Sequence, residues 1–191
     1  MGAVEAISDG NEVETMRNEQ LAPVDQHLPP GEILGCILVI SDYRLLNLGH
    51  ASALRRAGYA VYTAVTCTDV PRVFETFAVD HIDLIAFASL VHGWHHQEAE
   101  QRPSEIPEDT DGQWHTRNIL NVVEIVNSRQ QSPAKVLVAT DLLEHDCYEI
   151  TAGSLKAAGV QFESYSASNP TTIVGHLQRS GVAGSPARAG E

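Results

Sequence analysis

Basic residues are scarce in this sequence. The 191 residues include 12 lysines and arginines against 25 aspartates and glutamates, which gives a formal net charge of −13. Proteins that bind nucleic acid neutralise phosphates with a clustered stripe of lysine and arginine, and the sequence contains no such stripe. The composition therefore argues against nucleic acid as a partner.

Cysteines and long apolar runs are also few. The three cysteines, Cys36, Cys67 and Cys147, form no CxxC pair, so we interpret them as reduced packing residues and not as a disulfide framework. No apolar run approaches the ~18 residues of a membrane-spanning helix. The amino terminus also lacks the charged and then apolar pattern of a signal peptide. We therefore expect a soluble, cytoplasmic protein with no membrane partner.

The acidic residues are concentrated in two segments. Residues 1–31 and residues 97–112 each hold six acids and one arginine, a net charge of −5 apiece. The first segment is polar and ends in a Pro-Pro-Gly sequence, which is typical of a disordered tail. Residues 182–191 are rich in Gly, Ser, Pro and Ala and are predicted to be a flexible tail. One domain, residues 32–181, remains between the two tails.

Strand-like and helix-like segments alternate through this domain. Short apolar runs predict strands at about 33–40, 60–65, 82–88, 136–139 and 160–165. Helical patterns separate and follow them, with Gly58 and Gly159 placed to end two helices and Asn169 placed to cap the last one. In the first helix we expect one buried face made of Leu45, Leu46, Leu48, Ala51, Leu54 and Ala57. The alternation predicts a three-layer α/β fold with a five-stranded parallel sheet.

The alternation is interrupted at about residues 93–112. This acidic insertion is longer than a usual connection in such a fold, and long connections tend to be functional or disordered. The simplest interpretation is a solvated, flexible run of acids. The alternative is a segment that binds a partner or covers a pocket.

The order and spacing of these elements resemble the receiver domains of bacterial response regulators. The resemblance covers about residues 34–180 and depends on four short stretches, Ile37–Asp42, Leu54–Val61, Ile82–Ile85 and Ala157–Val160. It implies a flavodoxin- or CheY-like doubly wound sheet and a role in two-component signal transduction. Functional residues are then expected at the carboxyl ends of the strands.

The phosphorelay chemistry that the resemblance implies is largely missing. The position of the phosphoacceptor aspartate falls at Ala88, whose methyl group cannot form an acyl phosphate. The pair of acids that would hold Mg²⁺ is reduced to Ser41 and Asp42, and Mg²⁺ prefers several hard oxygens in an octahedral array. The strand-end hydroxyl is kept as Thr140, but the position of the expected lysine falls at Ser166.

This degenerate pocket indicates a pseudo-receiver. We expect no enzymatic activity, no cofactor and no residual Mg²⁺ binding, and we expect the domain to act as a protein-binding or regulatory module. The receiver resemblance places the interaction face on the last third of the domain. We assign to it Tyr148, Lys156, Glu163 and Tyr165, and we expect them to bind a protein partner or a second copy of the chain.

A histidine-rich loop supplies the alternative hypothesis. His92, His95 and His96 follow the third predicted strand, and imidazoles could bind Zn²⁺ or another transition metal together with Asp42. The chain would then be a metal-binding or enzymatic α/β domain. The spacing matches no standard ligand motif such as HExxH, so we predict no metal site and keep the three histidines as weak candidates.

Overall fold

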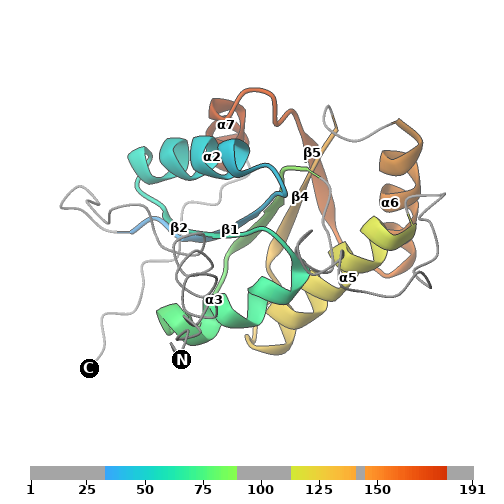
Figure 1. Cartoon of the computed structure of the whole chain (residues 1–191), viewed down its shortest axis with the longest axis horizontal. Coiled ribbons are helices and arrows are strands. Elements are labelled where there is room, and N and C mark those ends of the chain that lie inside the picture. Colours follow the sequence, from blue (N-terminus) through green and yellow to red (C-terminus); the bar gives the residue numbers. More distant parts are fainter. Residues whose placement is uncertain (1–32, 90–112, 141–144, 180–191) are drawn as a thin grey trace, which may run out of the picture.

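The structure is a computed structural model that describes residues 33–89, 113–140 and 145–179 (Figure 1). The predicted tails, residues 1–31 and 182–191, and most of the predicted insertion lie outside the described residues. In the described parts of the chain, no helix is long and apolar enough to cross a membrane.

Five parallel strands form one sheet in the order β2-β1-β3-β4-β5. The strands are β1 (Cys36–Ile40), β2 (Ala60–Ala64), β3 (Leu84–Phe87), β4 (Lys135–Ala139) and β5 (Phe162–Tyr165). β1 pairs with β2 on one side and with β3 on the other, so Ile37 lies between Val61 and Leu84. Flavodoxin and CheY share this doubly wound strand order, and the predicted fold class is confirmed.

Helices cover both faces of the sheet (Figure 1). One face carries α2 (Arg44–Arg56) and α7 (Thr171–Arg179), which pack against each other. The other carries α3 (Val70–Phe77), α5 (Gln113–Ser128) and α6 (His145–Ala157), and a short 3-10 helix, η1 (Cys67–Asp69), precedes α3. The five helices that the sequence predicts are confirmed.

Two hydrophobic cores lie on the two faces of the sheet, and β1 contributes to both. Ile37 and Val39 pack in the core under α2 and α7, whereas Leu38 and Ile40 pack in the core under α3, α5 and α6. All four side chains are fully buried. Burial on both faces is why this strand is apolar at every position and does not alternate with polar residues.

The predicted helix ends are also confirmed. Gly58 and Gly159 follow α2 and α6 with φ angles of +94° and +72°, a left-handed conformation that glycine adopts without a steric cost. Before α7, Oδ1 of Asn169 accepts a hydrogen bond from the backbone N of Thr171 at 3.1 Å. This bond satisfies one of the unpaired donors at the helix start.

The predicted buried face of α2 is wrong in part. Leu45 is 82% exposed and Leu48 is 38% exposed. The buried positions are Asn47, His50, Ala51, Ala53 and Leu54. The helix is rotated so that polar Asn47 and His50 face inward. Asn47 bonds there to the carbonyl of Ser41, and His50 packs edge-to-face against another buried ring, that of Tyr165. Two leucines are left on the surface as a consequence.

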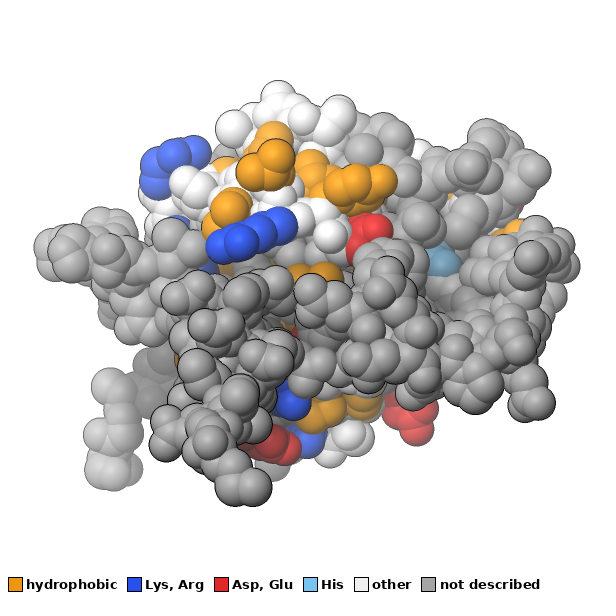
Figure 2. All heavy atoms as spheres, in the orientation of Figure 1, with side chains coloured by type: hydrophobic (Ala, Val, Ile, Leu, Met, Phe, Trp, Pro, Cys, Tyr) orange, Lys and Arg blue, Asp and Glu red, His pale blue; other side chains and the backbone are white. Residues whose placement is uncertain are grey.

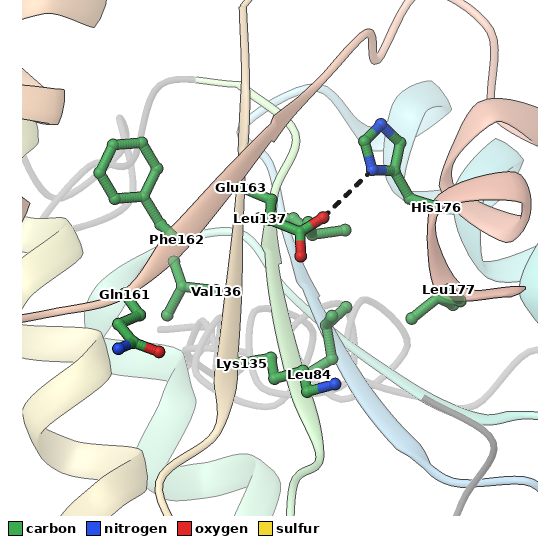
Figure 3. Close-up of a pocket in the computed structure, with 9 residues that line it drawn as sticks. All are labelled: Leu84, Lys135, Val136, Leu137, Gln161, Phe162, Glu163, His176 and Leu177. Carbon is green, nitrogen blue, oxygen red and sulfur yellow. Dashed lines mark ion pairs between the residues drawn. The ribbon is translucent and has the colours of Figure 1, made fainter. Parts of the chain in front are cut away.

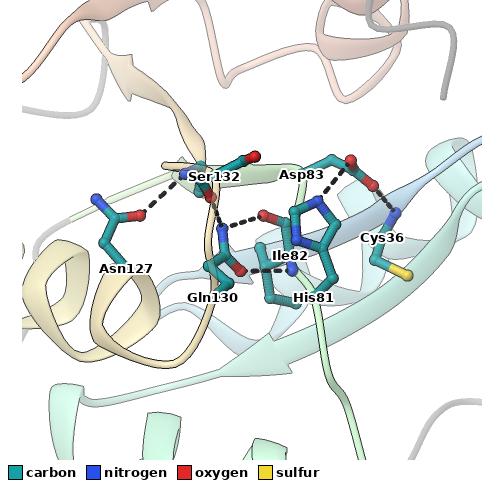
Figure 4. Close-up of polar contacts among 8 residues, drawn as sticks. Cys36, His81, Ile82, Asp83, Asn127, Gln130 and Ser132 are labelled. Carbon is teal, nitrogen blue, oxygen red and sulfur yellow. Dashed lines mark hydrogen bonds and ion pairs between the residues drawn. The ribbon is translucent and has the colours of Figure 1, made fainter. Parts of the chain in front are cut away.

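Side chains tie the amino ends of the central strands together (Figure 4). The Gln130 amide accepts a hydrogen bond from the backbone N of Ile82 at 2.9 Å and donates one to the carbonyl of Ile82 at 3.0 Å. The Asp83 carboxylate accepts one from the backbone N of Cys36 at 2.7 Å and lies 3.0 Å from Nε2 of His81. The starts of β1 and β3 and the end of α5 are joined by these contacts.

The Cys36 thiol beside this network is not poised for chemistry. Partial burial, and then the negative charges of Asp83 and Asp80, raise its pKa to about 11. Burial likewise raises the pKa of the Cys67 thiol. Because the thiolate is the reactive form, both cysteines behave as packing residues at neutral pH, as the sequence predicts.

Candidate functional site

The candidate site lies where β1 and β3 end. In the sheet, β1 lies between β2 and β3, and the chain continues from β1 into α2 on one face of the sheet. The strand order therefore reverses at β1. In doubly wound folds the crevice outside such a switch point is the usual place for ligands. Ser41 and Asp42 follow β1, and Ala88 and Ser89 follow β3. The structure thus brings together three of the predicted pocket residues and adds Ser89.

Ser89 is the centre of a hydrogen-bonded cluster. Its hydroxyl donates to Oδ1 of Asp42 and accepts from the backbone N of Asp42 at 3.1 Å. Its oxygen lies 2.7 Å from Oγ of Ser41, which itself accepts from the backbone N of Tyr43 at 3.0 Å. Because the Ser89 proton is directed at Asp42, the Ser41 hydroxyl donates either to Oγ of Ser89 or to the carbonyl of Tyr43 at 3.4 Å. Every hydroxyl proton of the cluster is used internally.

The cluster is largely withdrawn from solvent. Ser41 is fully buried and Ser89 is 1% exposed, whereas Asp42 is half-buried. Buried hydroxyls are costly unless they are hydrogen-bonded, and each of these has a partner. The sequence offers one weak signal for this arrangement, a polar residue directly after each of two neighbouring apolar strands.

Asn47 supports the cluster from α2. Its side-chain Nδ2 donates to the carbonyl of Ser41 at 2.8 Å and to that of Ala64 at 3.3 Å, so it joins the carboxyl ends of β1 and β2. The two carbonyl acceptors fix the orientation of the amide, since a flipped amide would place oxygen against oxygen. Within the described residues, the buried Oδ1 has no hydrogen-bond partner. Sequence analysis missed this residue.

Ala88 occupies the position that the receiver resemblance assigns to the phosphoacceptor. Its backbone N donates to the carbonyl of Ile40 at 2.9 Å, which continues the β1–β3 pairing by one residue. Its methyl group is fully buried in the core under α2 and α7. The side chain at this position therefore packs as part of the core and does not face a crevice.

A second carboxylate lies near this edge, but its partners are structural. Asp69 follows β2 in η1 and is 3% exposed. Its Oδ2 accepts from the backbone N of Val65 at 3.2 Å and from the backbone N and hydroxyl of Thr66, both at 2.9 Å. This capping box begins the η1–α3 segment, so the carboxylate is committed to the turn.

The other two predicted pocket residues lie at the ends of β4 and β5. Thr140 donates from its backbone N to the carbonyl of Tyr165 at 2.9 Å, and its hydroxyl lies 3.3 Å from the same oxygen. Oγ of Ser166 lies 3.1 Å from Oγ of Ser168, and the carbonyl of Ser166 accepts the hydroxyl of Thr172. These contacts link β4 to β5 and β5 to α7.

The predicted interaction face needs one correction. Tyr165 is 3% exposed and packs in the core, with its ring edge-to-face against His50 and His176 at centroid distances of 6.0 and 6.4 Å. Odd-numbered side chains of β5 face α7, and that of Tyr165 is enclosed in the core on this side, so it cannot form part of a surface. Lys156 and Glu163 are exposed, and Tyr148 is half-buried with its hydroxyl bonded to Ser164.

A shallow cavity of about 250 Å³ lies between the amino halves of β3–β5 and the end of α7 (Figure 3). Leu84, Leu137 and Leu177 contribute apolar surface, and Glu163 lies 3.5 Å from Nδ1 of His176. This cavity is at the opposite end of the sheet from the Ser89 cluster. Its apolar side chains belong to the core, so its floor offers little exposed surface to a ligand.

The metal candidates His92, His95 and His96 lie outside the described residues. Across residues 33–89, 113–140 and 145–179, no group of three His, Cys, Asp or Glu side chains is arranged to hold a metal ion.

No protein-family model and no curated protein sequence matches the chain. Among solved structures, a de novo designed Rossmann 2x3 fold protein is similar at 13% identity, with 82% of this chain and 99% of that chain covered and a TM-score of 0.44. The chemotaxis response regulator CheY4 of Vibrio cholerae is similar at 17% identity, with 76% and 98% covered and a TM-score of 0.45. The fold class rests on the strand order of the sheet itself, a five-stranded, doubly wound α/β fold.

Proposed function

We propose that the chain is a receiver-like signalling domain that works without phosphorylation, as a protein-binding or regulatory module and not as an enzyme. The strand order and the position of the polar cluster at the β1–β3 switch point support a receiver-like domain. The side chains at that switch point support the loss of phosphorylation.

Two observations together carry the proposal: the methyl group of Ala88 is buried in the core, and the Asp42 carboxylate accepts the hydroxyl of the next residue, Ser89. Phosphoryl transfer needs an acceptor oxygen and a metal ion that neutralises charge on the transferring group. The side chain of Ala88 has no oxygen that could accept a phosphoryl group. One oxygen of Asp42 accepts the Ser89 hydroxyl, and a single carboxylate is a poor ligand set for Mg²⁺.

Phosphorylation from a small donor tests this proposal directly. The purified full chain is incubated with acetyl phosphate and Mg²⁺, and its intact mass is compared with that of a phosphorylatable receiver treated in the same buffer. We expect no added phosphoryl group on this chain while the control protein is modified. A phosphoryl adduct that maps to any aspartate of the chain would overturn the proposal.

The outer surface of α6 and β5 is the proposed interaction face. Lys156 supplies an exposed charge on α6 and Glu163 supplies one on the α7 side of the edge strand β5, and Tyr148 links α6 to β5 through its bond to Ser164. A signal shifts a two-state equilibrium only if it binds the two states differently. Without a phosphoryl group to bias it, this face is presented at all times, and binding through it is constitutive.

Paired charge reversals test the interaction face. Lys156→Glu combined with Glu163→Lys keeps the net charge and should weaken self-association in sedimentation velocity across a concentration series. The matched control is Arg72→Glu combined with Glu75→Arg on α3, where both side chains are exposed. Association that survives the α6–β5 reversal but is lost on deletion of residues 97–111 would move the binding surface to that segment.

A further inference from the structure

The exposed side of α2 carries apolar side chains that the fold does not use. Tyr43 is 58% exposed, Leu45 82% and Leu48 38%, and Arg44 is exposed among them. We call these four residues the α2 patch. Figure 2 shows hydrophobic and Lys/Arg side chains side by side on the part of the surface where α2 lies in Figure 1. An apolar surface of this kind, with a charged rim, is typical of an interaction site.

The charge of this side of the molecule differs from that of the whole chain. α2 and α7 together contain four arginines and no acid, whereas α3, α5 and α6 each contain at least one acid. Arg55 donates to the carbonyl of Val61 at 2.8 Å and Arg56 to Oγ of Ser52 at 3.1 Å. Within the described ranges, no carboxylate pairs with the arginines of α2. The matching occupant is therefore an acidic segment with apolar side chains.

We propose that the occupant is the chain's own amino-terminal segment, residues 1–32, which docks on the α2 patch. Residues 1–31 carry a net charge of −5. Apolar residues are spaced among the acids, and they include Val4, Ile7, Val13, Met16 and Leu21. Acids would pair with the arginines of α2, and apolar side chains would cover Leu45 and Leu48.

The point at which the segment joins the body makes this contact easy to reach. The backbone N of Leu34 donates to the carbonyl of Gly58 at 3.0 Å, so the chain enters the fold at the carboxyl end of α2. The 13 residues of α2 span about 20 Å. At about 3.3 Å per extended residue, six or seven residues bridge that distance, and most of the segment remains available for contact.

Tethering favours this segment over the same segment of a second copy. Docking of the same segment from a second copy depends on the concentration of the protein in solution. A short tether, by contrast, holds the segment at an effective concentration in the millimolar range. The docked segment would lie beside the site, because the backbone N of Tyr43 donates to Oγ of Ser41 in the Ser89 cluster.

Zero-length cross-linking tests the proposal on the full chain. Lysine occurs at only two positions in the sequence, Lys135 and Lys156, so an added lysine is a specific probe. A carbodiimide joins a lysine to a carboxylate only when the two are in contact. Arg44→Lys places the probe in the α2 patch, and Arg72→Lys places the matched control at an exposed position of α3.

We expect links from position 44 to acids of residues 5–25 within one molecule, at a yield several-fold above that from position 72. Adding Leu45→Gln to the Arg44→Lys variant, or raising the salt concentration, should lower that yield several-fold. Three outcomes would overturn the proposal: a yield at position 44 no higher than the control, links mainly to residues 98–111, or links between ¹⁴N- and ¹⁵N-labelled copies in a mixture.

Discussion

Replacing Ser89 with alanine removes the hydroxyl at the centre of the site. That oxygen accepts from the backbone N of Asp42 at 3.1 Å, donates to the Asp42 carboxylate and lies 2.7 Å from the Ser41 hydroxyl. A hydrogen bond contributes about 1 kcal/mol net, and one to a charged group about 1.5–3 kcal/mol. Water partly replaces the contacts of half-buried Asp42, so we expect a loss of about 2–3 kcal/mol. For a chain of this size that lowers the melting temperature by roughly 4–12 °C.

Thermal and denaturant unfolding of the full chain measure this loss. Ser132→Ala is the matched control, because Ser132 is exposed. A double-mutant cycle with Asp42→Ala then isolates the Ser89–Asp42 contact, and residues in one network usually couple by about 0.5–3 kcal/mol. If Ser89→Ala costs no more than Ser132→Ala, or if the cycle gives no coupling energy, the hydrogen-bonded cluster described above does not form.

Two further predictions concern the amino end of the sheet. Gln130→Ala removes both hydrogen bonds to the backbone of Ile82 and should lower the free energy of unfolding by about 1–3 kcal/mol. The control, Gln131→Ala at an exposed neighbouring position, should leave the free energy of unfolding unchanged. Equal effects of the two substitutions would contradict the role of Gln130. Because the pKa of Cys36 rises from 9.0 to about 11, native Cys36 should alkylate at pH 8 about 100-fold more slowly than in the unfolded chain, as peptide mass spectrometry would show. Equal alkylation rates in the folded and unfolded chain would refute the shift. Between pH 9 and about pH 11 the unfolded chain loses a proton that the folded chain keeps, so the contribution of Cys36 to stability falls as the pH rises through this range.

The positions of the strands and the helix ends could be predicted because local chemistry determines them, whereas the doubly wound strand order was an implication of the receiver resemblance. Apolar runs such as Ile37–Ile40 have no amphipathic alternative and are buried on both faces. Gly58 and Gly159 end helices because they adopt a positive φ without steric cost, and Asn169 supplies a capping oxygen. None of these features depends on a distant part of the chain.

The rotation of α2 and the membership of the site could not be predicted, because contacts from distant strands decide them. Apolar residues at 45, 46 and 48 satisfy more than one helical register. Asn47 selects the register through carbonyls at the ends of β1 and β2, 6 and 17 residues away. Ser89 joins the site through partners 47 and 48 residues away. Tyr165 was misassigned because the direction of its side chain depends on which face of β5 meets α7.

Side-chain hydrogen bonds join β1 and β3 at both ends of the strand pair. Asp83 joins the start of β3 to the backbone of Cys36 at the start of β1, and Ser89 joins the end of β3 to Asp42 after β1. A shift of β1 along β3 by one residue would break the hydrogen bonds at both ends and would turn every side chain of β1 toward the core on the opposite face of the sheet. The amides of this strand pair should therefore exchange with solvent only through global unfolding. A partner that binds at the edge of the molecule would leave the pairing of β1 and β3 unchanged. A conformational change that such a partner causes would therefore have to be transmitted by the helices.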